Sequence, residues 1–137
     1  MFFKKEINKD QDNKLIKIAS LLIHAAKIDQ NYSDKEKYIV ESTLLELGAK
    51  KEKLKALISE AIENEKNSVQ ILDFTKEVKN MNEDEKIKII ETLWRIIYSN
   101  KDADIYETNL MRRLAGLLYV DSKIMGDIKD RIEKENL

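Results

Sequence analysis

Two short runs of oxygen-bearing side chains have the types and spacing to act together in this 137-residue chain. The first run comprises Asp29, Asn31, Ser33 and Glu36, and the second comprises Asn100, Asp102, Asp104 and Glu107. Carboxylate, amide and hydroxyl oxygens are the ligands that hard cations such as calcium and magnesium prefer. The sequence therefore predicts two candidate sites for a divalent cation.

The spacing of both runs begins like an EF-hand loop, with oxygen-bearing residues at the first, third and fifth positions. It then departs from that pattern. The sixth position holds Asp34 or Ile105 in place of glycine, and the twelfth holds Val40 or Met111 in place of a bidentate glutamate. We therefore do not expect an EF-hand.

Helix capping is the other interpretation of the same residues. In a capping box, a serine or aspartate side chain accepts a hydrogen bond from the amide three residues later, and a glutamate there reaches back to the cap amide. Ser33 with Glu36, and Asp104 with Glu107, have this spacing. Capping leaves the oxygens at positions 29, 31, 100 and 102 unexplained, so both interpretations stay open.

Other kinds of site find little support in the composition. There is no cysteine and His24 is the single histidine, which argues against disulfides, thiolate or zinc sites and a Ser–His–Asp arrangement. No glycine-rich phosphate loop is present. We expect His24 to be a helix-surface or packing residue, and the chain not to be an enzyme. With 25 basic and 26 acidic residues and only four arginines, nucleic-acid binding is not expected either.

The elements that must position these residues are predicted to be helices. Hydrophobic residues make up 42% of the chain and charged residues 37%, with three glycines and no proline, which is typical of an all-α domain. Apolar residues at three- and four-residue spacing predict helices over about 12–28, 33–47, 50–65, 68–78, 82–98, 104–118 and 122–132. The first is expected to carry a single apolar stripe.

These elements predict about seven helices in one compact bundle. A single domain is expected to span residues 1–137, with residues 1–11 frayed. Asn82 with Glu85 is predicted to cap one helix, Gly48 to end another as its C′ residue, and Asn67 or Ser68 to begin the short fourth helix. No secretory signal or apolar run of membrane-spanning length is apparent, so we expect a cytoplasmic protein without a transmembrane segment.

The two runs superpose at an offset of 71 positions, and the flanking apolar residues follow, with Leu22 on Leu93 and Leu47 on Leu118. The pattern predicts two helix–loop–helix units related by a pseudo-twofold axis. A glycine inside a helix costs about 1 kcal/mol relative to alanine. We therefore interpret Gly116 as permitting a close helix crossing near that axis.

Four aromatic residues follow or flank the second run: Trp94, Tyr98, Tyr106 and Tyr119. One interpretation is a patch that binds a partner. The other, which their helical spacing favours, is that they belong to the core or its rim.

The stretches AAKIDQNYSDKEKYIVESTLLELG (25–48) and LWRIIYSNKDADIYETNLMRRLAGLLYV (93–120) resemble the TerB-like family associated with tellurite resistance, in its stand-alone bacterial branch. The resemblance implies an all-α fold of about seven helices with an internal duplication. It also implies a role in stress responses, in sensing or binding metal, or as a co-chaperone-like scaffold. The family's acidic loops fall on Asp29, Gln30 and Glu36 and on Asn100, Lys101 and Glu107. This chain lacks both loop glycines and has Asn100 as the second loop's leading residue, departures that weaken a cation site.

Taken together, the residues and the resemblance predict a non-enzymatic binding or scaffold protein that acts in a stress response. Its expected partner is another protein, with a homodimer left open, and calcium or magnesium is the cation expected at the acidic loops. The alternative is a purely structural interaction module in which the acidic residues act only as helix caps.

Overall fold

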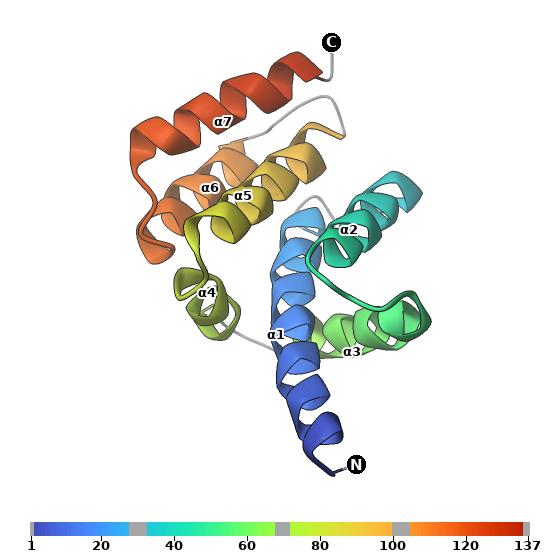
Figure 1. The fold of residues 1–137 in the computed structure, drawn as a ribbon. Helices are drawn as coiled ribbons and strands as arrows, with labels where there is room; N and C mark the ends of the chain where they lie inside the picture. Colours follow the sequence, from blue (N-terminus) through green and yellow to red (C-terminus); the bar gives the residue numbers. More distant parts are fainter. Residues whose placement is uncertain (1, 28–32, 68–71, 100–104, 136–137) are drawn as a thin grey trace.

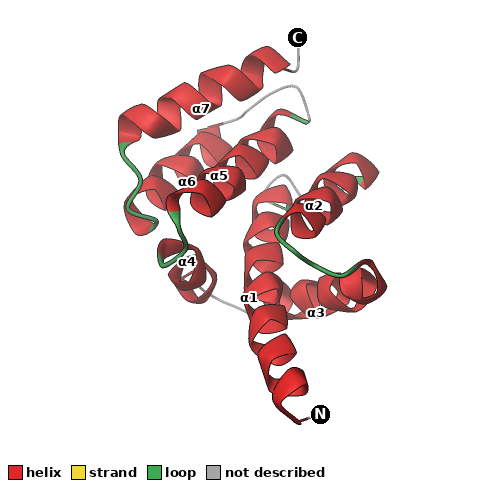
Figure 2. Cartoon of the chain, viewed as in Figure 1, coloured by secondary structure: helices red, strands yellow, loops and turns green. Residues whose placement is uncertain are grey.

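The computed structural model describes residues 2–27, 33–67, 72–99 and 105–135, and the side chains of residues 11–27, 33–67, 73–99 and 109–135. Within these ranges the chain is helical, without strands, and the helices pack as a bundle (Figures 1 and 2). The elements are α1 (Phe2–Ala26), α2 (Asp34–Glu46), the 3-10 turn η1 (Lys51–Lys53), α3 (Leu54–Asn67), α4 (Leu72–Lys79), α5 (Glu83–Tyr98), α6 (Ile105–Leu117) and α7 (Ser122–Glu135). The all-α prediction is confirmed.

The predicted boundaries differ from the observed ones in two places. Helix α1 begins at Phe2, ten residues before the expected start. The fraying expected for residues 1–11 stays a prediction, because helical geometry does not report how often a helix end opens. Asn67 was wrong as a cap of the fourth helix, because it is the last residue of α3; Ser68 lies outside the described residues.

Helix α1 is buried on more sides than the predicted single stripe. Besides the expected face, Leu21 and Ile23 are completely buried. The reason is that α2, α3, α4 and α5 all pack against α1. A helix enclosed by neighbours needs apolar residues around most of its circumference, so a one-stripe pattern underestimates its burial.

Helix α5 is the second central element, packed against α1, α2, α4 and α7. Its N-terminus is capped by Asn82, whose Oδ1 accepts a hydrogen bond of 2.9 Å from the amide of Glu85, as predicted. Its buried side chains join those of α1 in one hydrophobic core, and the fully buried members on α5 are Ile89, Ile90, Leu93, Ile96 and Ile97.

The internal repeat is visible in the helix boundaries. Helices α2 and α6 each have 13 residues, and their first residues, Asp34 and Ile105, are 71 positions apart. Gly48 follows the C-cap of α2 with a φ of +106°, and its amide donates to the carbonyl of Leu45 at 3.1 Å. The prediction of Gly48 as the C′ residue is confirmed, since only a left-handed residue closes the helix in this way.

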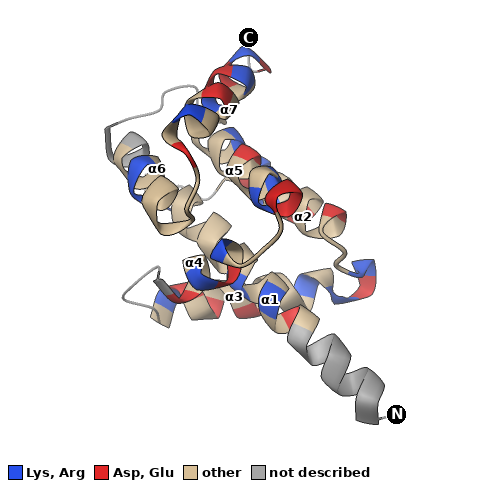
Figure 3. Ribbon diagram, turned by 60° about the vertical axis from the view of Figure 1, so that its left-hand side comes forward, with Lys and Arg blue, Asp and Glu red and all other residues tan. Residues whose placement is uncertain are grey.

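Basic and acidic residues are interspersed along α2, α5 and α7 (Figure 3). Several of them join helices: Lys88 of α5 contacts Glu46 of α2 at 2.7 Å, and Arg95 of α5 contacts Glu135 of α7 at 3.1 Å. None of the helices in the described ranges is long and apolar enough to cross a membrane.

Candidate functional site

The first predicted site lies where the chain passes from α1 to α2. Two of its expected ligands, Asp29 and Asn31, lie outside the described residues. The other two, Ser33 and Glu36, form a capping box at the start of α2. Ser33 Oγ accepts a hydrogen bond of 3.2 Å from the amide of Glu36, and the amide of Ser33 donates to Glu36 Oε1 at 2.8 Å.

This capping box uses both side chains for the fold. Ser33 has the extended backbone expected of an N-cap, with φ −74° and ψ 164°. The Glu36 side chain is held by the amide of Ser33, and the residue is only 1% exposed. Asp34 and Glu36 also place negative charge in the first turn, where the helix dipole favours it. The capping interpretation is therefore confirmed for Ser33 and Glu36.

The second predicted site lies between α5 and α6. Asn100, Asp102 and Asp104 lie outside the described residues, and so does the side chain of Glu107. Helix α6 begins at Ile105, directly after Asp104 in the sequence, as α2 begins directly after Ser33. In the sequence repeat, Asp104 corresponds to Ser33, the N-cap of α2. Cation binding by this run stays a prediction.

His24 connects two helices. Its Nδ1 lies 3.3 Å from Glu65 Oε1 on α3, and Lys27 Nζ lies 3.1 Å from the other oxygen of the same carboxylate. Glu65 thus joins the last turns of α1 and α3. This agrees with the prediction that His24 is a packing residue. In the described ranges, no three side chains of histidine, cysteine, aspartate or glutamate cluster in a way that could hold a metal ion.

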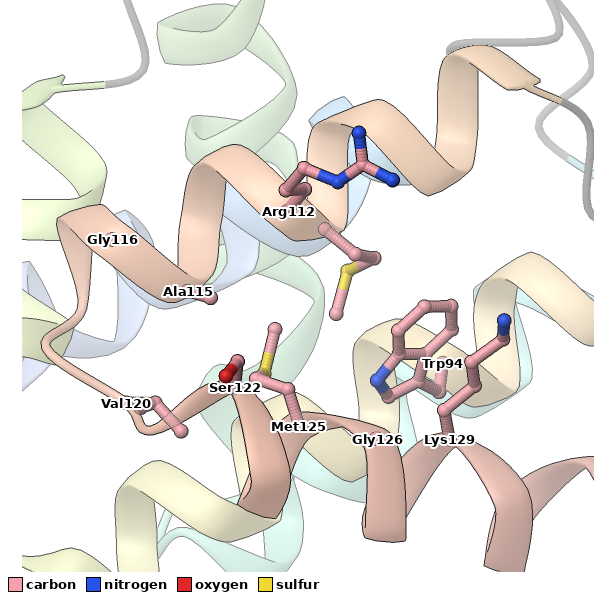
Figure 4. A pocket seen from close by; sticks show the side chains of 10 residues that line it. Trp94, Arg112, Ala115, Gly116, Val120, Ser122, Met125, Gly126 and Lys129 are labelled. Carbon is pink, nitrogen blue, oxygen red and sulfur yellow. The ribbon is translucent and has the colours of Figure 1, made fainter.

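A cavity that the sequence did not indicate lies between α5, α6 and α7, with a volume of about 440 Å³ (Figure 4). Trp94 of α5 and Met125 of α7 line it, and Arg112 and Lys129 are its two charged residues; the remaining lining residues are Met111, Ala115, Gly116, Val120, Ser122 and Gly126. Trp94 is 4% exposed, and its buried indole Nε1 has no hydrogen-bond partner in the part of the chain that the structure describes. Sequence reasoning missed this site because three separate helices form it.

The interpretation of Gly116 as a point of close helix crossing was wrong. A Cβ atom built on Gly116 would meet no heavy atom within 4 Å, apart from its neighbours and its own helix. Gly126 on α7 has the same open surroundings. Both glycines line the cavity. The absence of side chains at these two positions therefore adds to the open space between α6 and α7. Close packing does not require glycine at either position.

The four aromatic residues considered as a binding patch do not lie together on the surface, because two of them belong to the core. Trp94 and Tyr98 are 4% and 9% exposed, and their rings stack with centroids 5.9 Å apart. Tyr119 is 72% exposed, and Lys79 Nζ lies 4.6 Å from its ring centroid. The side chain of Tyr106 lies outside those described. The core interpretation is confirmed for Trp94 and Tyr98 but not for Tyr119.

The clearest electrostatic shifts lie where α5 meets α7. Hydrogen bonds from Arg95 lower the pKa of Glu135, and the same contact raises the pKa of Arg95. Burial, with the nearby Glu133 and Asp130 carboxylates, raises the pKa of the Tyr98 hydroxyl. The Arg95–Glu135 pair lies on the surface, so these shifts describe helix pairing rather than a catalytic group.

Residues 15–130 match the family model described as Tellurite resistance protein TerB. The match covers both helix junctions and the cavity. Comparison with curated proteins gave no match, and comparison with solved structures gave none either.

Proposed function

The chain belongs to the TerB family, and from this premise we propose that it is a non-enzymatic binding domain that docks another protein in a stress response. In this proposal Ser33 and Glu36 act as helix caps and not as cation ligands. Both side chains already have partners in the capping box. These two side chains of the first junction therefore serve the fold, which supports a role in binding rather than catalysis.

The observation that carries the docking proposal is the outward face of α2. Tyr38 is 71% exposed and Leu45 is 41% exposed, seven residues apart and hence on the same side of the helix. Asp34 and Glu41 are exposed on this side too. Val40 and Leu44 are buried on the opposite side, so the core does not require Tyr38 and Leu45. We call Asp34, Tyr38, Glu41 and Leu45 the α2 face.

The α2 face combines apolar side chains with carboxylates, and α2 lies at the edge of the bundle (Figure 1). One of the carboxylates, Asp34, also lies 3.7 Å from Lys37 of the same helix. Exposed apolar groups that alternate with charge are typical of helix-in-groove recognition. The complementary partner surface is apolar and basic, for example an amphipathic helix with lysine or arginine beside its apolar stripe. A second copy of the chain is a less complementary partner, because its α2 face carries the same negative charge.

Site-specific photo-crosslinking tests the docking proposal. A benzophenone amino acid replaces Tyr38 in one variant and Glu60, an exposed residue of α3, in the control variant. Irradiation of cells grown under tellurite stress should give a discrete adduct from position 38 and none from position 60. The double substitution Asp34→Lys/Glu41→Lys should abolish that adduct by reversing the charge of the face. Equal labelling at both positions, or an adduct that survives charge reversal, would contradict the proposal.

A second candidate function is binding of a divalent cation, calcium or magnesium, at the two junctions. The observation that favours it is the position of Glu36, a carboxylate that is 1% exposed and close in sequence to Asp29 and Asn31. A buried carboxylate is a strong attractor for a cation. A cation bound there would neutralise the clustered charge of this junction and, at the equivalent positions 100–107, of the second. A saturable rise in melting temperature with one cation would favour this candidate.

A further inference from the structure

The geometry of the cavity between α5, α6 and α7 points to a binding site for a small amphipathic carboxylate. We propose that the apolar body of such a ligand lies between α6 and α7, and that its carboxylate accepts the indole N–H of Trp94 in a cavity whose charged lining residues, Arg112 and Lys129, are both cationic. This site is separate from the α2 face and from both helix junctions. It therefore adds a small-molecule ligand to a domain whose proposed partner is a protein.

The first argument is the indole nitrogen. In the part of the chain that the structure describes, Trp94 Nε1 is the one buried side-chain nitrogen or oxygen without a hydrogen-bond partner. Other buried polar groups do have partners: the Ser20 hydroxyl, for example, bonds the carbonyl of Ile16 at 2.8 Å. A buried donor without an acceptor is costly and rare in folded proteins. An acceptor supplied by a ligand would remove this cost.

The second argument is the position of that nitrogen. It lies on the edge of the indole ring that faces Met125, and both residues line the cavity (Figure 4). Methionine is unbranched and flexible, so its side chain can shift to admit a ligand atom more easily than a branched residue can. Met125 can therefore move to let an acceptor reach the indole nitrogen.

The third argument is the pair of glycines. Gly116 and Gly126 lie inside α6 and α7, where alanine would stabilise the helix, and no heavy atom lies within 4 Å of a Cβ built on either. Packing therefore does not explain them. Their effect is to keep space open in a cavity of about 440 Å³, which falls in the ~300–1,000 Å³ range typical of small-molecule sites. Stability is commonly given up in this way at binding sites.

The fourth argument is charge. Among the residues that line the cavity, the two charged ones, Arg112 and Lys129, are both cationic. Neither forms an ion pair with any residue in the described ranges, and Lys129 Nζ lies 5.7 Å from the ring centroid of Trp94. A carboxylate in this cavity would be attracted by both cations in addition to the indole N–H, whereas an uncharged apolar molecule would gain nothing from the two charges.

Trp94 is the only tryptophan, so its indole N–H gives one isolated resonance in a ¹H–¹⁵N spectrum. The probes are sodium octanoate, octan-1-ol, which has the same chain without charge, and sodium acetate, which has the charge without the chain. Octanoate should shift the indole proton downfield saturably. Octanol should bind at least about tenfold more weakly, because it lacks the charge-assisted hydrogen bond. Acetate should leave the resonance unchanged.

Two sets of variants locate the binding. Gly126→Leu fills the cavity and should abolish the octanoate shift, whereas Gly126→Ala should retain it. Arg112→Gln/Lys129→Gln should weaken octanoate about tenfold or more and leave octanol unchanged. Because Arg112 is exposed, the Arg112→Gln/Lys129→Gln variant should fold and test the proposal even if Gly126→Leu does not fold. Octanol binding as tightly as octanoate, no saturable indole shift, or an unaltered affinity in the Arg112/Lys129 variant would each overturn the proposal.

Discussion

Gly48 and Tyr119 lie 71 positions apart and occupy the same place at the ends of α2 and α6, both with positive φ, +106° and +56°. At each end two backbone hydrogen bonds close the helix. In α2 the amides of Gly48 and Ala49 donate to the carbonyls of Leu45 and Leu44, at 3.1 and 2.9 Å, and in α6 the amides of Tyr119 and Val120 donate to those of Gly116 and Ala115, at 3.3 and 3.0 Å. This is the Schellman arrangement, in which the left-handed residue is usually glycine. The repeat therefore preserves the backbone geometry of the helix end, although the second copy carries a tyrosine there.

Replacing Tyr119 by glycine is predicted to stabilise the protein. A left-handed conformation costs a residue with a Cβ about 1–2 kcal/mol. The contact with Lys79, worth about 0.5–1 kcal/mol, would be lost. The net expectation is a rise of about 0.5–1 kcal/mol in the free energy of unfolding, measured by urea denaturation. Lys79→Met, which removes only the cation, is the control and should be slightly destabilising. A less stable Tyr119→Gly variant would contradict the prediction.

The converse substitution, Gly48→Ala, is predicted to destabilise by about 1–2 kcal/mol. Its φ is unfavourable for alanine, and the new Cβ would lie 3.2 Å from Gln11 Nε2. Because the backbone is the larger cause, Gly48→Ala/Gln11→Ala should remain nearly as unstable as Gly48→Ala alone. Full recovery in the double variant would show that the side-chain contact dominates.

The cap of α2 gives a third prediction. Ser33→Ala removes the acceptor for the amide of Glu36 and should lower the free energy of unfolding by about 0.5–2 kcal/mol. Ser33→Asp keeps an acceptor at the cap and should be close to the wild type. Chemical denaturation of the three proteins is the measurement. Equal losses for Ala and Asp would mean that the hydroxyl, and not capping in general, is what the site requires.

Two buried threonines join α2 to α5. Thr92 Oγ1 donates to the carbonyl of Lys88 at 2.9 Å, so its only hydroxyl proton is used. Thr43 Oγ1, 2.9 Å from Thr92 Oγ1, must then be the donor of that pair. A double-mutant cycle of Thr43→Val and Thr92→Val should give a coupling of about 1 kcal/mol in unfolding experiments. A coupling of zero would mean that the hydroxyl pair contributes nothing to the docking of these helices.

The Arg95–Glu135 pair makes part of the stability depend on pH. The pKa of Glu135 is lowered by its hydrogen bonds from Arg95, so this contribution is complete above the ordinary glutamate pKa of about 4.3. It is lost as pH falls through the lowered, folded-state pKa. Glu135 is 46% exposed, so the effect should stay below about 1 kcal/mol and shrink with salt.

Urea unfolding of the wild type and Glu135→Gln at pH 6 and pH 3 measures this contribution. The wild type should lose more stability than the variant between the two pH values. An NMR titration that placed the Glu135 pKa at or above its usual value would contradict the assignment.

Features encoded within a few residues could be predicted from the sequence. The Ser33–Glu36 box, the Asn82 cap and the Gly48 helix end each depend on neighbours three to five residues away. Features that depend on three-dimensional packing could not. Burial of Leu21 follows from the helices that surround α1, and the cavity beside Trp94 requires three helices to meet.

Gly116 is another residue whose role depends on three-dimensional packing and could not be predicted from the sequence. Its conformational cost was evident from the sequence, but the reason for it could be read only from its surroundings. A helical glycine permits a close contact or leaves an open space, and no local pattern distinguishes the two. The structure assigns the open space, because nothing approaches within 4 Å of the missing Cβ.

The central claim about the first junction, that Ser33 and Glu36 serve as helix caps and not as cation ligands, is tested most directly by thermal unfolding of chelator-treated protein against calcium, magnesium, manganese and zinc. Glu36→Gln is the companion variant, because its amide oxygen can still accept the hydrogen bond from Ser33 while its charge is removed. We predict no saturable change in melting temperature with any cation for either protein. Saturable stabilisation of the wild type by one cation at micromolar concentration, lost in Glu36→Gln, would contradict the account and make the junction a cation site.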